Sequence, residues 1–195
     1  MKNIVVFASG SGSNFQSIID SVHAGKLNTR ITGLISNKHG IKSLERASDN
    51  QIPGRVISEA DYDSYEEYSK ELLDQLQSWN TDLIILAGFL RKIPSLVIQA
   101  FEHRILNIHP SLLPKYGGKG FYGLNVHGAV LEAGDLFSGC TVHVVSEEYD
   151  KGPILEQAKV QVYKSDTPQT LAKRVLEQEH ILYPKVISNY LTSLS

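Results

Sequence analysis

The sequence is poor in several residue types that mark specialised classes of protein. Its 195 residues include one cysteine, one methionine and one tryptophan. One cysteine cannot close a disulfide within the chain, and it cannot form a CxxC-type metal site. Cys140 is therefore expected to be a reduced structural residue, and the sequence predicts no metal.

Neither sign of charge dominates, and no long apolar run is present. The 19 basic and 21 acidic residues give a formal charge of −2, which creates no field that would attract nucleic acid or an acidic membrane surface. No apolar stretch approaches the roughly 20 residues of a membrane span, and Ile4–Phe7 is too short for a signal peptide. We expect a cytoplasmic protein that binds small molecules, with neither nucleic acid nor membrane as a partner.

The spacing of apolar residues predicts an α/β fold. Short apolar runs rich in β-branched residues alternate with helical patterns. Strands are expected at 4–8, 31–35, 55–57, 83–87 and 104–108, and helices at 14–24, 42–50, 62–79 and 94–100. This alternation is typical of a doubly wound, mostly parallel, Rossmann-like sheet with the strand order 3-2-1-4-5.

The second half of the chain has a different pattern. A helix is expected at 125–132, and strands at 140–146 and 155–163 form an antiparallel C-terminal pair joined by a turn at 149–153. The last helix begins at Thr167-Pro168, a cap followed by a proline in the first turn, and should bend or break at Pro184. We expect one domain over 1–195.

Three unusual segments fall at carboxyl ends of predicted strands, where ligands bind in open α/β sheets. They are Ser9–Asn14 after the first strand, Gly88–Ile93 after the fourth and Asn107–Tyr116 after the fifth. Because strands one and four are neighbours in the predicted order, these segments should meet in one crevice. The second segment offers backbone groups and an apolar wall to a flat heterocycle, unless it is a plain connection.

The first segment, SGSGSN, opens a predicted helix. Glycines allow a ligand to approach the backbone, and the free N–H groups of a first helical turn favour an anion. The third glycine of a dinucleotide motif is absent, because Phe15 stands there, and the second strand ends at Asn37 rather than at an acid. The segment therefore fits a single phosphate better than a dinucleotide, and a tight turn with Ser13 as N-cap is the alternative.

The third segment carries an amide and an imidazole two residues apart. Strand alternation turns Asn107 and His109 to the same side. The amide can donate to a developing oxyanion and the imidazole can move a proton near pH 7, which suits acyl chemistry. Asp150 is the best placed carboxylate to orient the histidine. The alternative is a buried structural histidine and a solvated turn aspartate.

The remaining titratable residues of interest are interpreted as structural. Glu147 and Glu148 lie in the same turn as Asp150 and are expected to be solvated. The other candidate histidines lack the close spacing of metal ligands; they are His103, His127 and His143.

Five motifs occur along the chain in one order: SGSGSN at 9–14, LAGFLR at 86–91, NIHPSLLPKY at 107–116, DxGPI at 150–154 and QEHxxYP at 178–184. Essentially end to end, the chain resembles the folate-dependent formyltransferase family. The NxHPSLLP block is very specific for folate-dependent formyl transfer. The first and last motifs narrow the resemblance to the phosphoribosylglycinamide formyltransferases.

The resemblance implies a one-step formyl transfer in purine synthesis. The donor would be 10-formyltetrahydrofolate, used as a cosubstrate, and the acceptor would be the amine of glycinamide ribonucleotide, with no metal and no covalent enzyme intermediate. Asn107, His109 and Asp150 would be catalytic. Asn107 would donate to the tetrahedral oxyanion, and His109, held charged by Asp150, would stabilise it and pass a proton to the departing folate nitrogen.

The resemblance also assigns binding residues. Those for the ribonucleotide, with its phosphate at the helix start, would be Gly12, Ser13, Asn14 and Glu179. Those for the folate would be Leu90, Arg91, Lys92, Ile93 and Asn107. Residues 1–100 would form a phosphate-binding half and residues 101–195 a catalytic and folate-binding half, in a monomer or a homodimer.

Two features depart from the family pattern. The family often has a basic residue near the start of the third helix that helps to hold the phosphate, whereas the matching position here is Tyr65. The stretch 117–125, GGKGFYGLN, is several residues longer than usual. It would make a mobile flap, in which Lys119 could help to hold the anion.

Three alternatives are weighed against this interpretation. A methionyl-tRNA formyltransferase usually carries a second, basic C-terminal domain, and a 10-formyltetrahydrofolate hydrolase usually carries an N-terminal regulatory domain. We expect neither here, because about 195 residues suffice for a formyl-transfer domain alone. A non-catalytic nucleotide-binding module would keep the glycine-rich turn, but it has no need for Asn107, His109 and Asp150.

Overall fold

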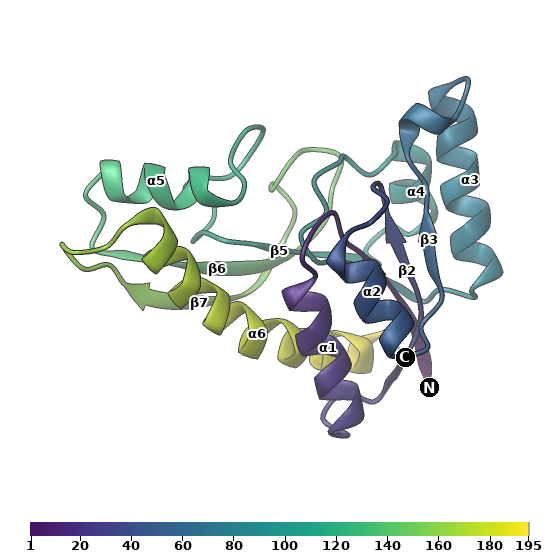
Figure 1. Ribbon diagram of the computed structural model, residues 1–195, viewed down its shortest axis with the longest axis horizontal. Helices are drawn as coiled ribbons and strands as arrows, with labels where there is room; N and C mark the ends of the chain where they lie inside the picture. The colour runs from purple at the N-terminus through teal and green to yellow at the C-terminus, as the bar shows by residue number, and fades with distance from the viewer. Residues whose placement is uncertain (195) are drawn as a thin grey trace.

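A computed structural model describes residues 1–194 of the chain. Its centre is a seven-stranded sheet with the order β3-β2-β1-β4-β5-β6-β7 (Figure 1). The first five strands run parallel, and β6 and β7 run antiparallel to their neighbours. The strands are β1 Lys2–Phe7, β2 Thr29–Ser36, β3 Gly54–Val56, β4 Leu83–Leu86, β5 Ile105–His109, β6 Phe137–Val144 and β7 Ile154–Gln161. The predicted doubly wound, mostly parallel sheet with an antiparallel C-terminal pair is confirmed.

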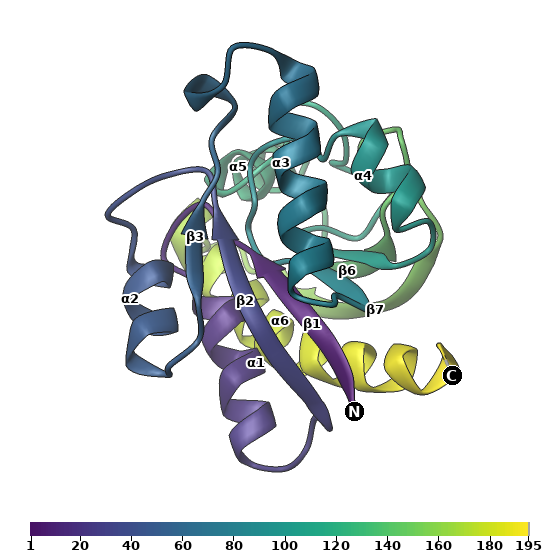
Figure 2. The same cartoon turned by 90° about the vertical axis from the view of Figure 1, so that its right-hand side faces the viewer.

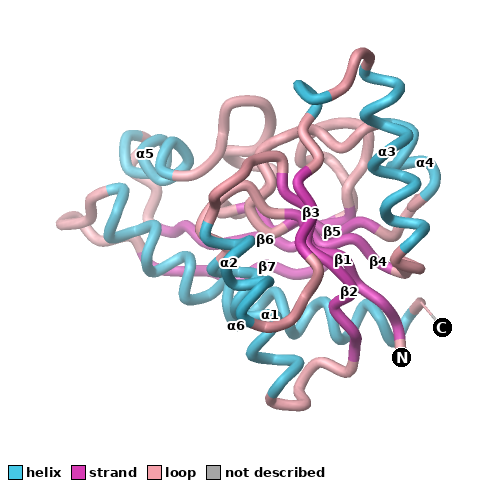
Figure 3. The backbone as a smooth tube through the Cα atoms, turned by 45° about the vertical axis from the view of Figure 1, so that its right-hand side comes forward, coloured by secondary structure: helices cyan, strands magenta, loops and turns pink. Residues whose placement is uncertain are grey.

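Helices cover both faces of this sheet, as Figures 2 and 3 show. Helices α1 (Ser13–His23), α2 (Lys42–Asp49) and α6 (Pro168–Ser193) pack on one face, and α3 (Tyr65–Ser78) and α4 (Ser95–Ala100) pack on the other. Helix α5 (Leu124–Glu132) lies against α6, and a short 3₁₀ helix spans Glu59–Asp61. Among the described residues, no helix is long and apolar enough to cross a membrane.

The strands of the parallel part are apolar on both faces because both faces are covered. In β1, Ile4 and Val6 enter one hydrophobic cluster, while Val5 and Phe7 enter the other. Cys140 is also fully buried, and burial raises the pKa of its thiol to about 12. A structural role for this cysteine is therefore supported.

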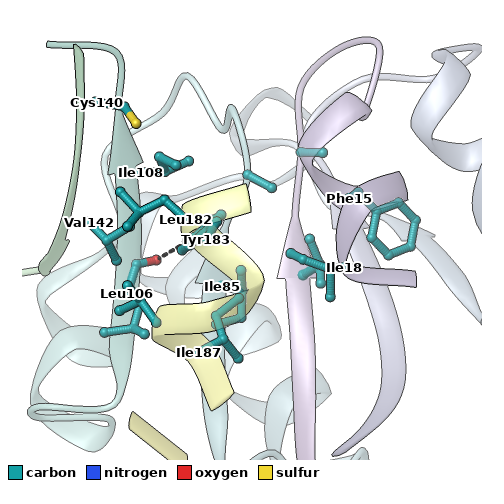
Figure 4. Packing of buried hydrophobic residues seen from close by; sticks show 14 of the residues in the cluster. Phe15, Ile18, Ile85, Leu106, Ile108, Cys140, Val142, Leu182, Tyr183 and Ile187 are labelled. Atoms are coloured by element: carbon teal, nitrogen blue, oxygen red, sulfur yellow. Dashed lines mark hydrogen bonds between the residues drawn. The ribbon is translucent and has the colours of Figure 1, made fainter. Parts of the chain in front are cut away.

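Helix α6 begins where the sequence predicts and is not broken at Pro184. Thr167 caps it through a capping box and Pro168 opens its first turn, as predicted. The helix then continues through Pro184 to Ser193, so the predicted break does not occur. Pro184 removes one backbone hydrogen bond, but the helix is held there by the buried Tyr183, whose hydroxyl donates to the carbonyl of Leu106 at 3.0 Å (Figure 4).

Helix α3 begins later than its apolar stripe suggested. The stripe predicted a start at Tyr62, whereas the helix begins at Tyr65. The hydroxyl of Ser64 accepts the backbone N–H of Glu67, which caps the helix at this point. Local capping, rather than the hydrophobic pattern, thus fixes this end of the helix.

Candidate active site

The carboxyl ends of β1, β4 and β5 open into one cavity of about 670 Å³. The three segments singled out in the sequence all reach it, as the topology predicts. The loop 118–124, the β6–β7 connection and the first half of α6 complete its walls. Of the predicted site residues, those that line the cavity are Ser13, Asn14, Leu90, Arg91, Lys92, Ile93, Asn107, His109, Asp150 and Glu179.

Gly12 does not line the cavity but shapes the turn behind it. It is the N-cap of α1, with φ 68° and no side-chain cap, so the suggested capping role of Ser13 is wrong. A Cβ at this position would lie 2.6 Å from the Cβ of Ser43 on α2. Only glycine fits both the left-handed backbone and this close approach. The first-turn N–H groups of α1 are thereby left for a ligand.

A serine ties the glycine-rich turn to its neighbours. The hydroxyl of Ser9 donates to Asn37 Oδ1 at 2.6 Å and accepts the backbone N–H of Leu90 at 3.0 Å. Asn37 stands where a dinucleotide-binding protein has an acid, and here its side-chain oxygen accepts a hydrogen bond from Ser9. The ends of β1, β2 and β4 are held together by these two bonds.

Asn14 and Glu179 form a buried pair although 165 residues separate them. The amide nitrogen of Asn14 donates to Glu179 Oε2 at 2.6 Å, and Asn14 Oδ1 has no partner among the described residues. Burial raises the pKa of Glu179, which the Asn14 bond only partly opposes. This pair joins the start of α1 to α6 at one end of the cavity.

A cluster of four side chains occupies another part of the cavity wall. His109 Nδ1 lies 3.6 Å from Asp150 Oδ2, and its Nε2 lies 2.7 Å from the carbonyl oxygen of Tyr116. His143 Nε2 lies 3.1 Å from Asn107 Nδ2 and 3.5 Å from Asp150 Oδ1. The expected association of Asn107, His109 and Asp150 is therefore present, with His143 as a fourth member.

The position of Asp150 depends on an uncommon backbone conformation. Its φ is 55°, a region that residues other than glycine rarely adopt. Its Oδ2 accepts the backbone N–H of Gly118 at 2.8 Å. The long loop 117–125 is thus bonded directly to the carboxylate that faces both histidines.

Burial sets the charge state of His109. Desolvation lowers the pKa of His109, although Asp150 and the Tyr116 carbonyl favour the charged ring. The pKa of Asp150 is lowered as well, because contacts with His143, His109 and Gly118 outweigh its burial. Burial thus opposes the expected effect of Asp150, which favours the charged ring of His109.

Two histidines interpreted as structural have closer ties to the site than predicted. His143 belongs to the cluster above, and His127 lines the cavity with its pKa lowered to about 4 by burial and by His109. Glu147 and Glu148 are exposed, as predicted, although Glu147 accepts the hydroxyl of Ser95 at 2.7 Å and lies 4.0 Å from Lys92 Nζ. Only the register of β6 against β5, which pairs Asn107 with His143, could have indicated the place of His143.

The two departures from the family pattern lie near or within the cavity. Tyr65 is exposed at the start of α3 and brings no positive charge. Residues 118–124 line the cavity, and Gly118, Gly120 and Gly123 have positive φ. Lys119 of this loop and Lys173 of α6 also line it, and neither forms an ion pair within residues 1–194.

The described part of the chain contains no cluster of metal-ligating side chains. Within residues 1–194, no three histidine, cysteine, aspartate or glutamate side chains are grouped so that they could hold a metal ion. The cavity lining includes two amides, three imidazoles, four carboxyl groups and four basic side chains: Asn14, Asn107, His109, His127, His143, Glu147, Glu148, Asp150, Glu179, Arg91, Lys92, Lys119 and Lys173.

The chain matches proteins of known family over almost all of its length. The model of the family described as "Formyl transferase" matches residues 2–187. Phosphoribosylglycinamide formyltransferase of Escherichia coli is 41% identical over 95% of this chain and 85% of its own length. The chloroplastic enzyme of that name from Arabidopsis thaliana is 48% identical over 95% of this chain, which spans 64% of that longer protein.

Solved structures agree with the sequence matches. Glycinamide ribonucleotide transformylase 1 from Symbiobacterium toebii superposes with a TM-score of 0.93 at 37% identity, covering 99% of this chain and 89% of that one. A formyltetrahydrofolate deformylase from Pseudomonas syringae superposes with a TM-score of 0.88 at 23% identity, over 98% of this chain and 62% of that one. The latter likeness is one of fold alone.

Proposed function

The chain belongs to the formyl transferase family, and from this premise we propose that it transfers the formyl group of 10-formyltetrahydrofolate to the amine of 5'-phosphoribosylglycinamide in purine biosynthesis. The observation that carries the proposal is the cluster of Asn107, His109 and Asp150 in a cavity that also holds the start of α1 and Glu179. The relatives that cover this chain support the choice of acceptor, since they bear the name phosphoribosylglycinamide formyltransferase.

The ribonucleotide binds between α1 and α6. Its phosphate meets the first-turn N–H groups of α1, beside Ser13 and Asn14, on the turn that Gly12 makes possible. Glu179 bonds the same substrate, because its carboxyl group is buried at the edge of the cavity and only one of its oxygens is used by Asn14. The formyl-folate binds along Leu90–Ile93, which lines the cavity and in which the apolar side chain of Leu90 is exposed.

The phosphate needs a cation that α3 does not supply here. Lys119 and Lys173 approach the cavity from the loop 117–125 and from α6, and both are free of ion pairs within the described chain. They take the place of the basic residue that Tyr65 replaces. Because both side chains are exposed, their contribution to binding is modest and depends on salt.

Transfer proceeds by direct attack of the substrate amine on the formyl carbon. A bond forms between that nitrogen and the formyl carbon, the bond from the formyl carbon to folate N10 breaks, and the amine proton ends on N10. Asn107 donates an N–H to the oxyanion of the tetrahedral intermediate. Removing such a donor typically costs about 10²–10³-fold in rate.

His109 moves the proton as a neutral base. The Tyr116 carbonyl only accepts, so Nε2 carries the ring hydrogen and Nδ1 is the basic nitrogen. Protonation of Nδ1 creates an imidazolium 3.6 Å from Asp150 Oδ2, which stabilises it. Asp150 therefore acts on the protonated intermediate state of the ring and not on its resting state.

An assay with two acceptors tests the proposal. Purified protein is given 10-formyltetrahydrofolate with and without glycinamide ribonucleotide, in the absence of ATP and added metal. Formation of formylglycinamide ribonucleotide together with tetrahydrofolate is the expected result. Brisk release of formate to water with no product from glycinamide ribonucleotide would identify a 10-formyltetrahydrofolate hydrolase and overturn the proposal.

A further inference from the structure

His143 holds a place in the site that its burial alone does not explain. It lies in β6 directly opposite Asn107 of β5 in the antiparallel register. Its side chain is 2% exposed, and both ring nitrogens have polar neighbours. A structural role would satisfy both nitrogens equally well, but here one of the partners is Asn107, the proposed donor to the oxyanion.

The carbonyl of Val144 places a hydrogen on Nδ1 of the ring. It lies 3.0 Å from Nδ1 and can only accept a hydrogen bond. Nε2 faces two groups, the Asn107 amide at 3.1 Å and Asp150 Oδ1 at 3.5 Å. In the tautomer that has its one hydrogen on Nδ1, Nε2 offers a lone pair to these neighbours.

This tautomer decides how the Asn107 amide is turned. With one N–H bonded to Nε2, the amide nitrogen faces His143 and its second N–H remains free for a substrate oxygen. A half-turn of the amide would set Oδ1 against the Nε2 lone pair and would remove the donor from the site. The ring thus favours the one amide orientation in which Asn107 can donate to an oxyanion.

We infer that His143 is a positioning residue that fixes the donor orientation of the Asn107 amide. The inference rests on the proposed function, in which Asn107 stabilises the oxyanion. His143 does not touch the substrate and acts through Asn107. Asp150 Oδ1, 3.5 Å from Nε2, is the other group through which it could act, and the experiment separates the two routes.

The experiment compares His143→Phe and His143→Gln in three backgrounds: wild type, Asn107→Ala and Asp150→Asn. Phenylalanine keeps the ring volume without either nitrogen, while glutamine presents a carbonyl oxygen near the place of Nε2. In the wild-type background His143→Phe should lower kcat about 10–100-fold, as for other supports of a site residue, with little change in either KM. His143→Gln should restore much of this loss.

Dependence on Asn107 is the decisive readout. In the Asn107→Ala background the effect of His143→Phe should shrink to within about twofold, because nothing is left to orient. Equal effects in the wild-type and Asn107→Ala backgrounds would overturn the inference. So would an effect that vanishes in Asp150→Asn but persists in Asn107→Ala, since His143 would then act through the carboxylate.

Two further measurements keep the result interpretable. Thermal melting and circular dichroism identify a variant that has lost its fold. If His143→Phe does not fold, the comparison between the three backgrounds is made with His143→Gln instead. A long-range ¹H–¹⁵N spectrum of the wild type should show His143 protonated at Nδ1 alone, and protonation at Nε2 would overturn the inference. If wild-type protein releases formate to water instead of transferring it, the proposed function fails, and the same comparison is made on that turnover.

Discussion

The two ends of the cavity are built by different means. At the proposed catalytic end, Asn107, His109, His143 and Asp150 share partners at short range, and both histidines are almost completely buried. At the proposed phosphate end, a glycine-shaped turn presents backbone N–H groups, and Lys119 and Lys173 are exposed. Under the proposed function, interlocked side chains serve chemistry that needs defined hydrogen positions, whereas backbone geometry and distributed charge serve the binding of a doubly charged group.

This contrast has a consequence for substitutions. Interlocked side chains lose function together, so single changes at the catalytic end should be large, should lower kcat and should not add. Changes at the phosphate end should act mainly on the KM for the ribonucleotide. Four predictions test this difference, from the largest expected effect to the smallest.

Removing the catalytic base should have the largest effect. His109→Ala and Asp150→Ala should each lower kcat by about 10²–10⁴-fold, because proton transfer loses its base or the stabilisation of its charged form. Steady-state kinetics with both substrates measures this, and thermal melting checks that the fold survives. Near-normal rates in both variants would mean that the catalytic end is not where we locate it.

Breaking the glycine-rich turn should come next. Gly12→Ala places a side chain in a left-handed backbone, at a cost of about 1–2 kcal/mol, and against Ser43 on α2. We expect a lower melting temperature and a KM for the ribonucleotide raised more than kcat is lowered. Gly10→Ala is the matched control, because a Cβ there meets nothing within 4 Å; equal effects of the two variants would argue against the role given to Gly12.

The titration of His109 sharpens the electrostatic side of the comparison. Since burial lowers its pKa, NMR should find the imidazole titrating below its ordinary 6.5 and neutral at pH 7. A carboxylate favours the imidazolium, so Asp150→Asn should lower the pKa of His109 further. A His109 that titrates above 6.5 in the free protein would contradict both the resting state and the role of base proposed for it.

Removing the exposed cations should have the smallest effect. Lys119→Ala and Lys173→Ala should each raise the KM for the ribonucleotide by about two- to fivefold, the range of an exposed charge pair, and leave kcat unchanged. The increase should shrink at high salt. Lys26→Ala is the control, because this exposed lysine follows the opposite end of α1, and an equal effect there would indicate only a loss of general charge.

Some elements could be derived from the sequence because their cause is local. The β-branched runs and helical stripes predicted the strands, the helices and the order of the parallel part, since both faces of such a sheet must be covered. The cap at Thr167 could be predicted for the same reason, because capping depends on neighbouring residues. The start of α3 was mispredicted, because a cap at Ser64 outweighed the hydrophobic stripe. Of the two outcomes expected at Pro184, a bend or a break, the break is absent, and the buried Tyr183 holds α6 at this point.

The site also contains some features that the sequence predicts and others that depend on tertiary contacts. Asn107, His109 and Asp150 are identifiable from motifs and residue chemistry, and strand alternation already turns the first two to one side. The pairing of Asn107 with His143 and of Asn14 with Glu179 depends on strand register and on contacts across 165 residues. Such contacts leave no periodic trace in the sequence, so His143 looks structural until the sheet is assembled.

By itself, the sequence determined the fold class, the location of the cavity and the residues proposed to react in it, because hydrophobic period, turn chemistry and residue type are local properties. Only the tertiary structure decided that burial lowers the pKa of His109, that His143 lies against the Asn107 amide and that Gly118 bonds to Asp150. These depend on burial and on hydrogen-bond partners from distant segments, which exist only once β5, β6 and their loops are packed together.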